Sequence, residues 1–208
     1  MAVKVVGIVG SYRKGKIIDG AVSAVLEGAE ARGAETRKIC LLDMHIEFCT
    51  NCRSCTQKQV EARRGPCVHN DDMERILAEI DEAEGVVLAS PINFGTVTAL
   101  VKRFIERLIC YGYWPWGQAM APVNRIAKTD KKAITITSSA CPAFLGRILM
   151  PSALSIQKKA ARVMGAEVIK SLYFGPVAGR QDSLLSGKAQ RKARKAGEDL
   201  VLRIRAEK

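Results

Sequence analysis

Four cysteines lie close enough together in the sequence to bind one metal centre. They are Cys49, Cys52, Cys55 and Cys67, and the first three form a Cys-x2-Cys-x2-Cys run. Thiolates at this spacing can turn around one compact centre, which is how proteins hold a 4Fe-4S cluster. The same side chains suit a tetrahedral zinc ion. The pattern therefore predicts a 4Fe-4S cluster, with zinc or free thiols as the alternatives.

A second chemical feature is the polar loop that follows an apolar, β-branched run at residues 3–9. Its sequence is Gly10-Ser11-Tyr12-Arg13-Lys14-Gly15-Lys16. A helix should begin directly after the loop, so unpaired N–H groups and the positive end of the helix dipole face it. Arg13 can donate two hydrogen bonds to a phosphate, and Lys16 adds a positive charge. The loop predicts a phosphate site; the alternative is an ordinary basic turn.

The loop matches neither of the common nucleotide-binding motifs. Gly7 and Gly10 are not followed by a correctly placed third glycine, and no Gly-Lys-Ser/Thr occurs. Both the dinucleotide fingerprint and the P-loop are therefore excluded. A smaller ligand with one terminal phosphate fits better. In flavodoxin-like sheets flavin mononucleotide (FMN) binds beside the first strand, at the point where the strand order reverses.

Strand and helix patterns alternate along the chain and predict how these residues are positioned. Apolar runs at residues 3–9, 35–42, 86–89, 133–137 and 168–174 are expected strands, separated by amphipathic helices. This alternation indicates an α/β fold, namely a flavodoxin-like, doubly wound, five-stranded parallel sheet of order 2-1-3-4-5. Residues 1–208 are expected to form one domain, with a cysteine-rich excursion at about 43–70. The loops 11–16, 90–96 and 138–141 should meet at the carboxyl edge of the sheet.

Composition and charge narrow the class of protein. Seven cysteines without a signal-peptide pattern indicate a cytoplasmic protein that uses thiols for metal or redox chemistry. No apolar run approaches the length of a membrane span. The net charge of +12 owes much to the last helix, where a solvated basic face is expected. The aromatic interleaving of a single-strand binding surface is missing, which argues against nucleic acid as a partner.

Several motifs in order along the chain resemble the NADPH-dependent FMN reductase family, and the cysteine pattern within it resembles the iron–sulfur flavoproteins. The motifs are Gly10-Ser11-x-Arg13-Lys14-Gly15, Asp71-Asp72-Met73, Ser90-Pro91-Ile92-x-Phe94-Gly95 and Lys102-x-Phe104-Ile105-x-Arg107. The resemblance implies bound FMN and a homo-oligomer. It places the phosphate on Ser11, Arg13 and the start of the helix. It places the isoalloxazine ring against Pro91, Ile92, Asn93, Phe94 and Gly95, and we add Ser138 and Ser139 from the neighbouring loop.

The chain departs from the family pattern at three points. Lys16, Ile17 and Ile18 stand where Gly-Asn-Thr commonly continues the phosphate loop, so backbone N–H groups and Lys16 must hold the phosphate there. Asn93 replaces a common aromatic residue beside the flavin. The spacing between Cys55 and Cys67 is also longer than iron–sulfur flavoproteins typically have.

These features predict an FMN-binding oxidoreductase of the iron–sulfur flavoprotein type, which passes electrons between a reduced donor and an acceptor. One alternative is an NAD(P)H-dependent FMN or quinone reductase without a cluster, in which the nicotinamide binds only transiently. An alternative from another class is a non-catalytic basic binding protein. No catalytic side chain is predicted, since the flavin itself carries the hydride or electron.

Smaller features have structural interpretations. Asp71 is expected to cap a helix. Cys40, Cys110 and Cys141 are expected to be small buried hydrophobic residues. The aromatic loop at residues 111–116 is expected to cover the flavin, to form a subunit interface or simply to pack on the surface.

Overall fold

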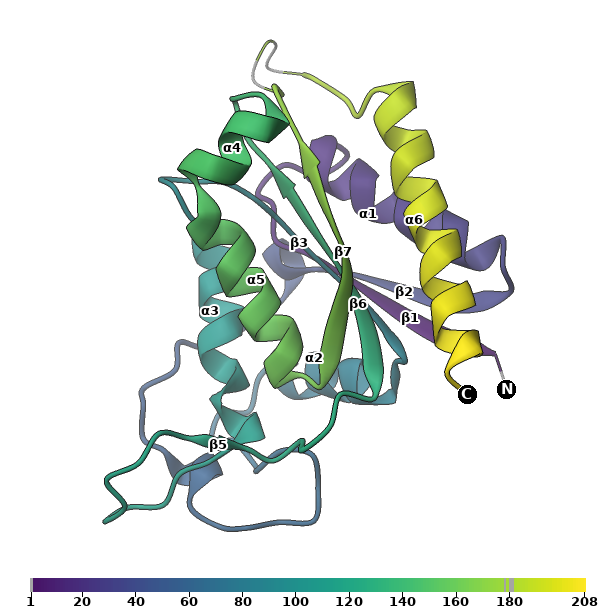
Figure 1. The fold of residues 1–208 in the computed structure, drawn as a ribbon. Helices are drawn as coiled ribbons and strands as arrows, with labels where there is room; N and C mark the ends of the chain where they lie inside the picture. Colours follow the sequence, from purple (N-terminus) through teal and green to yellow (C-terminus); the bar gives the residue numbers. More distant parts are fainter. Residues whose placement is uncertain (1, 178, 180–181) are drawn as a thin grey trace.

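A five-stranded parallel sheet forms the centre of the computed structural model, which describes residues 2–177, 179 and 182–208 (Figure 1). The sheet has the order β2-β1-β3-β6-β7, which confirms the predicted topology. Its strands are β1 (Val3–Val9), β2 (Ala34–Cys40), β3 (Gly85–Pro91), β6 (Lys131–Ser138) and β7 (Ala166–Phe174). A short antiparallel hairpin of β4 (Gly112–Tyr113) and β5 (Val123–Asn124) was not predicted, because two-residue strands leave no periodic signal.

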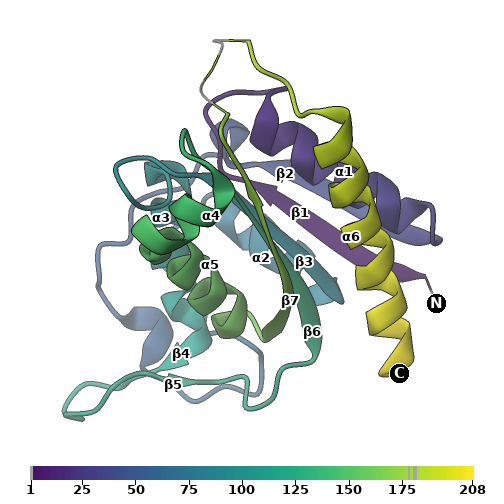
Figure 2. The ribbon, with the colours of Figure 1, turned by 45° about the horizontal axis from the view of Figure 1, so that its top comes forward.

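Helices cover both faces of the sheet, as Figures 1 and 2 show. One face carries α1 (Ile17–Glu30) and α6 (Gly187–Ala206); the other carries α2 (Asp72–Glu82), α3 (Ala99–Arg107) and α5 (Pro151–Val163). The short helix α4 (Ala143–Leu149) was not predicted. The 3-10 turns are η1 (Leu41–Asp43), η2 (Ser54–Thr56) and η3 (Leu108–Tyr111). Each face of the sheet therefore has its own apolar core.

The inner strands are apolar along their length because both of their faces are buried. Val86, Val87 and Leu88 on the central strand β3 are fully buried, because helices pack against both of its faces. The edge strand β2 alternates between buried and exposed residues instead. The uninterrupted apolar runs thus identify the inner strands that lead to the carboxyl edge.

Helices α1 and α6 pack closely through two glycines. A Cβ atom at Gly197 would lie 1.8 Å from the carbonyl oxygen of Val25, and one at Gly28 would lie 2.0 Å from the carbonyl oxygen of Arg194. Real Cβ atoms do not approach a backbone oxygen this closely. Glycine at both positions is therefore what allows the basic helix α6 to pack against α1.

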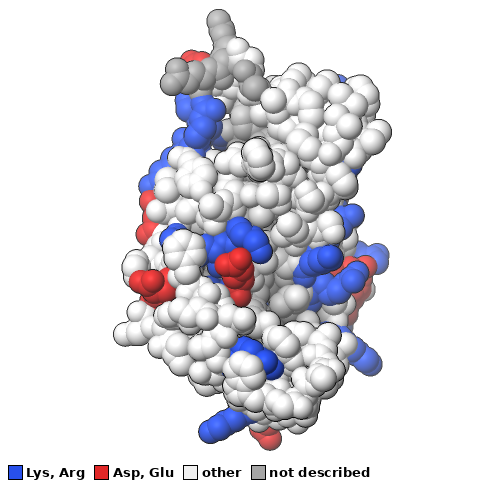
Figure 3. Space-filling view, turned by 90° about the vertical axis from the view of Figure 1, so that its left-hand side faces the viewer, with Lys and Arg blue, Asp and Glu red and all other residues white. Residues whose placement is uncertain are grey.

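The charged residues do not form one continuous basic surface on the face shown in Figure 3. Lysine and arginine side chains are interspersed there with acidic ones on a mostly uncharged surface. Within the described ranges, no helix combines the length and apolar character needed to cross a membrane.

The contact between α1 and α6 generates a prediction for stability. Gly197→Ala should lower the free energy of unfolding by about 1–3 kcal/mol, because the added methyl group forces the two helices apart. Urea unfolding followed by circular dichroism measures this change. The control is Gly187→Ala at the start of α6, where the nearest atom is a flexible arginine nitrogen at 3.7 Å. A Gly197→Ala protein as stable as the parent would contradict the proposed close contact.

Candidate functional site

The carboxyl ends of three parallel strands bring the predicted cofactor loops together. Val9 pairs with Ala89 at the end of β1 and β3, and Pro91 pairs with Ser138 at the end of β3 and β6. The loops that follow these strands therefore begin at one edge of the sheet. The backbone N–H of Ile92 also donates to the carbonyl oxygen of Ser138 at 2.8 Å. The structure thus places the three predicted loops side by side.

Thr98 connects the first two loops, and the sequence analysis missed it. Its hydroxyl group donates to the carbonyl oxygen of Gly10 at 2.7 Å, and its N–H donates to Ser90 Oγ at 3.1 Å. The N–H of Gly10 donates to Ala89 at 2.8 Å. A Cβ atom at Gly10 would lie 1.8 Å from the side chain of Val101, so this close approach requires glycine. A threonine just before an amphipathic helix was the available signal, because threonine is a good N-cap residue.

The phosphate loop leaves the start of α1 available to an anion. The N-cap residue of α1, Lys16, makes no side-chain capping bond, whereas Asp71, Thr98 and Ser186 cap α2, α3 and α6. The first N–H groups of a helix lack partners within the helix itself. This end of α1 therefore retains the donors that a phosphate would bind.

The cations of the loop differ in their partners. Lys14 forms an ion pair with Asp43, and the Lys16 ammonium donates to the carbonyl oxygen of Asp182 at 3.5 Å. The Arg13 guanidinium is exposed and has no ion-pair partner within residues 2–177, 179 and 182–208. The Arg13 N–H donates to the buried Ser11 Oγ at 3.1 Å, which holds the turn. Arg13 is thus the loop cation best placed for a bound phosphate.

Packing of α1 against the core limits how Ile17 and Ile18, the next two predicted cofactor-binding residues, can contact a ligand. The Ile18 side chain is buried in the core between the sheet and α1, and Ile17 packs against the same core. Only their backbone N–H groups can face a ligand at the helix start.

Asp19 is an acidic residue at this site that the sequence analysis did not consider. Its carboxylate accepts a hydrogen bond from the N–H of Gly15 at 2.6 Å and pairs with the Lys38 ammonium at 2.9 Å. Burial alone would raise its pKa, but these two partners lower the pKa of Asp19 below its ordinary value. Lys38 therefore offsets a negative charge that would otherwise oppose a phosphate in this loop.

The loop after β3 forms a tight turn with an exposed aromatic residue at its tip. Asn93 and Thr96 exchange two backbone hydrogen bonds, at 2.9 and 3.1 Å. Phe94 and Gly95 between them have φ values of 49° and 78°. Phe94 is fully exposed, whereas Ile92 packs against the core beneath it. The turn thus presents Asn93 and Phe94 outward, beside the half-buried Pro91.

The third loop contains a short chain of hydrogen-bonded side chains. Tyr173 donates to Ser139 Oγ at 2.8 Å, and Ser139 Oγ lies 3.2 Å from Cys141 Sγ. Ser138 is buried at the end of β6. Cys141 is half-buried, as is Cys40, so both predictions of a buried cysteine are wrong; Cys110 is buried as predicted. Cys40 is the last residue of the edge strand β2, and Cys141 follows the end of β6, where the chain leaves the core.

The cysteine segment lies at the other end of α3 from the cofactor loops. In Figures 1 and 2 it passes beside β4 and β5, below the lower end of α3. Thr98 caps α3 at the carboxyl edge of the sheet, and Arg107 at its last turn contacts Cys67. At about 1.5 Å per residue, the helix separates these two contacts by about 14 Å.

The four predicted ligands share one neighbourhood but differ in exposure. Cys55 is buried, Cys49 and Cys67 are half-buried, and Cys52 is exposed. Burial, followed by the charges of Cys67, Cys49 and Cys52, raises the pKa of Cys55 to about 11. Backbone and side-chain donors of Ser54 lower the pKa of Cys52. Among the described residues, however, no three histidine, cysteine or acidic side chains converge closely enough to hold a metal ion.

The cysteines supply thiol groups, which are the ligands that iron–sulfur clusters and zinc use, although no three of them converge in the described part of the chain. All seven cysteines of the chain are free thiols. Asn51 and Arg53, which alternate with the cysteines, have φ values of 54° and 60°. Such left-handed residues turn the chain sharply between successive thiols. The thiols are thus the donor type that an iron–sulfur cluster or zinc uses, but the described residues do not arrange them as a formed metal site.

The aromatic loop packs on the cysteine segment. The Arg53 guanidinium lies 3.5 Å from the ring centre of Trp114 and 3.9 Å from that of Trp116. The N–H of Trp114 donates to the carbonyl oxygen of Thr56 at 2.9 Å. Of the three alternatives for this loop, these contacts favour packing on the surface of the cysteine segment. This cation–π contact could not be predicted from the sequence, because its residues are far apart in the chain and leave no periodic pattern of apolar residues.

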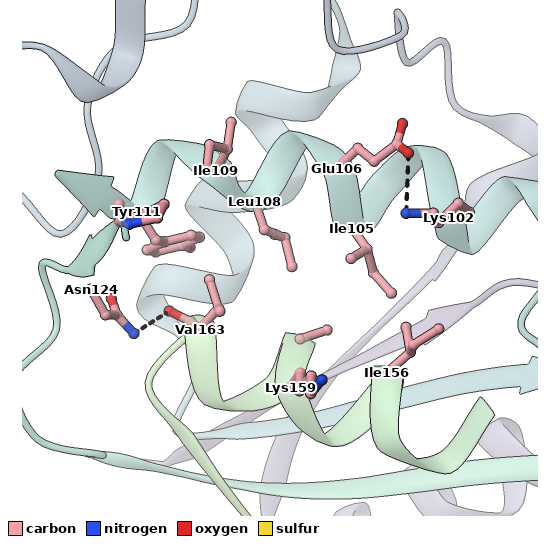
Figure 4. Close-up of a pocket in the computed structure, with 13 residues that line it drawn as sticks. Lys102, Ile105, Glu106, Leu108, Ile109, Tyr111, Asn124, Ile156, Lys159 and Val163 are labelled. Atoms are coloured by element: carbon pink, nitrogen blue, oxygen red, sulfur yellow. Dashed lines mark hydrogen bonds and ion pairs between the residues drawn. The ribbon is translucent and has the colours of Figure 1, made fainter. Parts of the chain in front are cut away.

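A separate apolar pocket of about 440 Å³ opens between α3 and α5 (Figure 4). Ile105, Leu108 and Ile109 line one side, and Ile156 and Val163 line the other. None of its residues belongs to the three cofactor loops. The pocket is therefore distinct from the predicted FMN site.

Curated relatives match about half of the chain. An iron-sulfur flavoprotein from Archaeoglobus fulgidus is 38% identical over 112 residues, which cover 54% of this chain and 48% of the relative. An iron-sulfur flavoprotein from Methanosarcina thermophila is 31% identical, over 51% of this chain and 52% of the relative. The matched region thus spans about half the length of these relatives.

Solved structures share the fold over almost the whole chain. An NAD(P)H:quinone oxidoreductase from Methanothermobacter marburgensis has a TM-score of 0.71 at 18% identity, covering 96% of this chain and all of its own. A flavodoxin from the domain Archaea has a TM-score of 0.56 at 12% identity, covering 97% of this chain and 99% of its own. At this identity the two structures show the flavodoxin-like fold alone. The model of the NADPH-dependent FMN reductases matches residues 3–160, which contain all three cofactor loops, and the chain belongs to that family.

Proposed function

We propose that the protein binds FMN at the carboxyl edge of the sheet and passes electrons between a reduced donor and an acceptor. The observation that carries this proposal is the phosphate loop, where an uncapped helix start meets the Arg13 guanidinium, which has no ion-pair partner in the described part of the chain. A phosphate monoester matches these donors in charge and geometry. Family membership supports FMN as the ligand that carries this phosphate.

Each loop has its own part in this proposal. Ser11, Arg13, Lys16 and the N–H groups of Ile17 and Ile18 would bind the phosphate. Pro91, Ile92, Asn93, Phe94 and Gly95 would lie along the ring, with Ser138 and Ser139 at the next strand end. When bound, FMN supplies hydride and electron transfer, so the chain needs no acid–base side chain for that step. The residues bind and orient the cofactor, and NAD(P)H is the proposed transient donor.

We further propose that Cys49, Cys52, Cys55 and Cys67 hold a 4Fe-4S cluster. The names of the curated relatives and the four clustered thiols support this assignment. Zinc uses the same donors. A reductase without any cluster is the second candidate, because the ligands do not converge among the described residues. Metal analysis separates these three cases.

The remaining proposals concern the cellular location, the domain organisation and the oligomeric state of the protein. We place the protein in the cytoplasm, because a chain with seven cysteines, four of them in one short segment, is typical of thiol chemistry in a reducing compartment. We also propose that residues 1–208 form a single flavodoxin-like domain. We also propose a homo-oligomer, since Phe144, Ile148 and Leu149 of α4 are exposed. The basic binding protein considered from the sequence is displaced by the family membership.

The phosphate loop gives the first functional prediction. Arg13→Ala should weaken FMN binding by about 1.5–3 kcal/mol, because a hydrogen-bonded charge on the phosphate is lost. Fluorescence titration of the apoprotein with FMN measures the change. The matched control is Lys14→Ala in the same loop, whose ammonium already pairs with Asp43. Equal affinity of the parent and Arg13→Ala proteins would remove Arg13 from the site.

The middle cysteine gives the second functional prediction. Cys52→Ala should remove or destabilise the metal centre while FMN remains bound, because the flavin loops belong to the sheet and Cys52 does not. Iron, zinc, acid-labile sulfide and FMN are measured in protein prepared without oxygen. Cys40→Ala, at the end of β2, serves as the control.

The pattern of metal loss distinguishes the candidates. Iron and sulfide in the parent that disappear with Cys52→Ala support the cluster. Zinc in the parent would instead support a structural site. A parent with FMN but neither metal would support the reductase without a cluster.

A further inference from the structure

An ion pair beside the phosphate loop joins α1 to the edge strand β2. The carboxylate of Asp19, in the first turn of α1, is buried and accepts from the Lys38 ammonium at 2.9 Å. Lys38 comes from β2 and also donates to Ser23 Oγ at 2.9 Å. The other carboxylate oxygen of Asp19 accepts from the N–H of Gly15 at 2.6 Å. The pair therefore connects the loop, the helix that follows it and the neighbouring strand.

Asp19 shapes the loop without filling the space in front of it. Gly15 has a φ of 67°, and a Cβ atom at this position would have no neighbour within 4 Å. Its N–H is held by Asp19, so the left-handed turn is fixed beside open space. The N–H groups of Ile17 and Ile18 at the start of α1 are left for a ligand.

The ion pairs around the loop leave two positive charges in excess. Lys38 neutralises Asp19, and Lys14 forms an ion pair of its own. Neither Arg13 nor Lys16 has a carboxylate partner in the described part of the chain. A phosphate monoester carries about 1.5 to 2 negative charges at pH 7. The two unpaired cations match this charge only while Lys38 neutralises Asp19.

Helix stability alone does not explain the partner from β2. A carboxylate in the first turn stabilises a helix through its dipole, and it needs no lysine for that effect. The same carboxylate places a negative charge at the helix end that a phosphate would occupy. Lys38 removes this conflict, because its ammonium lies directly on the Asp19 carboxylate.

We propose that Lys38, acting through Asp19, is a positioning residue that makes the loop select a flavin with a phosphate over a flavin without one. This inference rests on the proposed FMN site. FMN and riboflavin have the same ring system and differ in the terminal phosphate. Lys38 should therefore contribute to the affinity for FMN and leave the affinity for riboflavin almost unchanged.

Fluorescence titrations of the apoprotein with FMN and with riboflavin test this role. Lys38→Met leaves the Asp19 charge without a partner and should weaken FMN binding by about five- to tenfold, the order expected for one added charge near a partly exposed anion site. Riboflavin binding should change by less than about twofold, because riboflavin carries no charge for Asp19 to repel.

Two further variants separate the effect of charge from an effect on folding. The double variant Lys38→Met with Asp19→Asn removes both charges, and the amide oxygen can still accept from the N–H of Gly15. It should restore the parent preference for FMN. Asp19→Asn alone leaves Lys38 unpaired and should strengthen FMN binding by about fivefold. This single variant also covers the case in which Lys38→Met fails to fold.

Lys170→Met is the matched control. The Lys170 ammonium pairs with Asp199 at 3.1 Å, and Lys170 lies on the other edge strand, β7. The exposed fractions of the Lys170 and Lys38 side chains are 39% and 37%, so both variants remove one charge from an equally exposed ion pair. The control should bind both flavins as the parent does.

The parent affinities for the two flavins test the phosphate site itself. A parent that binds FMN no more tightly than riboflavin contradicts the proposed FMN site. A parent that prefers FMN, with the same preference in Lys38→Met and Asp19→Asn, leaves that site in place and contradicts the role of Lys38. Equal losses for both flavins in Lys38→Met, which the double variant does not repair, would make the ion pair purely structural and also contradict the proposal.

Discussion

Parallel pairing of β1, β3 and β6 is the constraint on which both the fold and the proposed flavin site depend. Parallel strands end at the same edge, so residues that are far apart in sequence arrive together there. The register between Pro91 and Ser138 sets the spacing of two loops, and Thr98 ties the first loop to them through Gly10. The cofactor site is therefore a consequence of strand order combined with a few backbone hydrogen bonds.

Helix α3 links this edge to the cysteine segment. Its N-cap residue, Thr98, donates to the carbonyl oxygen of Gly10 at the carboxyl edge of the sheet, and its last residue, Arg107, donates to Cys67. The Phe104 side chain of this helix is fully buried, so α3 is anchored in the core between its two ends. The same helix also lines the separate apolar pocket shown in Figure 4.

Local patterns were sufficient to predict the sheet order, the main helices and the Asp71 cap. Apolar runs and helical periodicity depend on burial, which leaves a direct trace in the sequence. The pairing of Asp71 with Arg107 leaves none, because it joins residues that only the tertiary fold brings together. For the same reason the contact of Arg53 with Trp114 was not predicted. The bond of Asp19 to Gly15 is local, and the acidic residue was not considered as part of the phosphate loop. The short helix α4 was too brief to produce a periodic signal.

The visible absorption spectrum of protein isolated without oxygen tests the central claim most directly, because flavin and cluster absorb differently. The account predicts flavin bands on top of a broad band near roughly 400 nm, and the broad band alone should persist after FMN is stripped. Flavin bands alone would leave the fold and the phosphate loop intact but contradict the cluster. A colourless protein that does not bind added FMN would contradict the account as a whole.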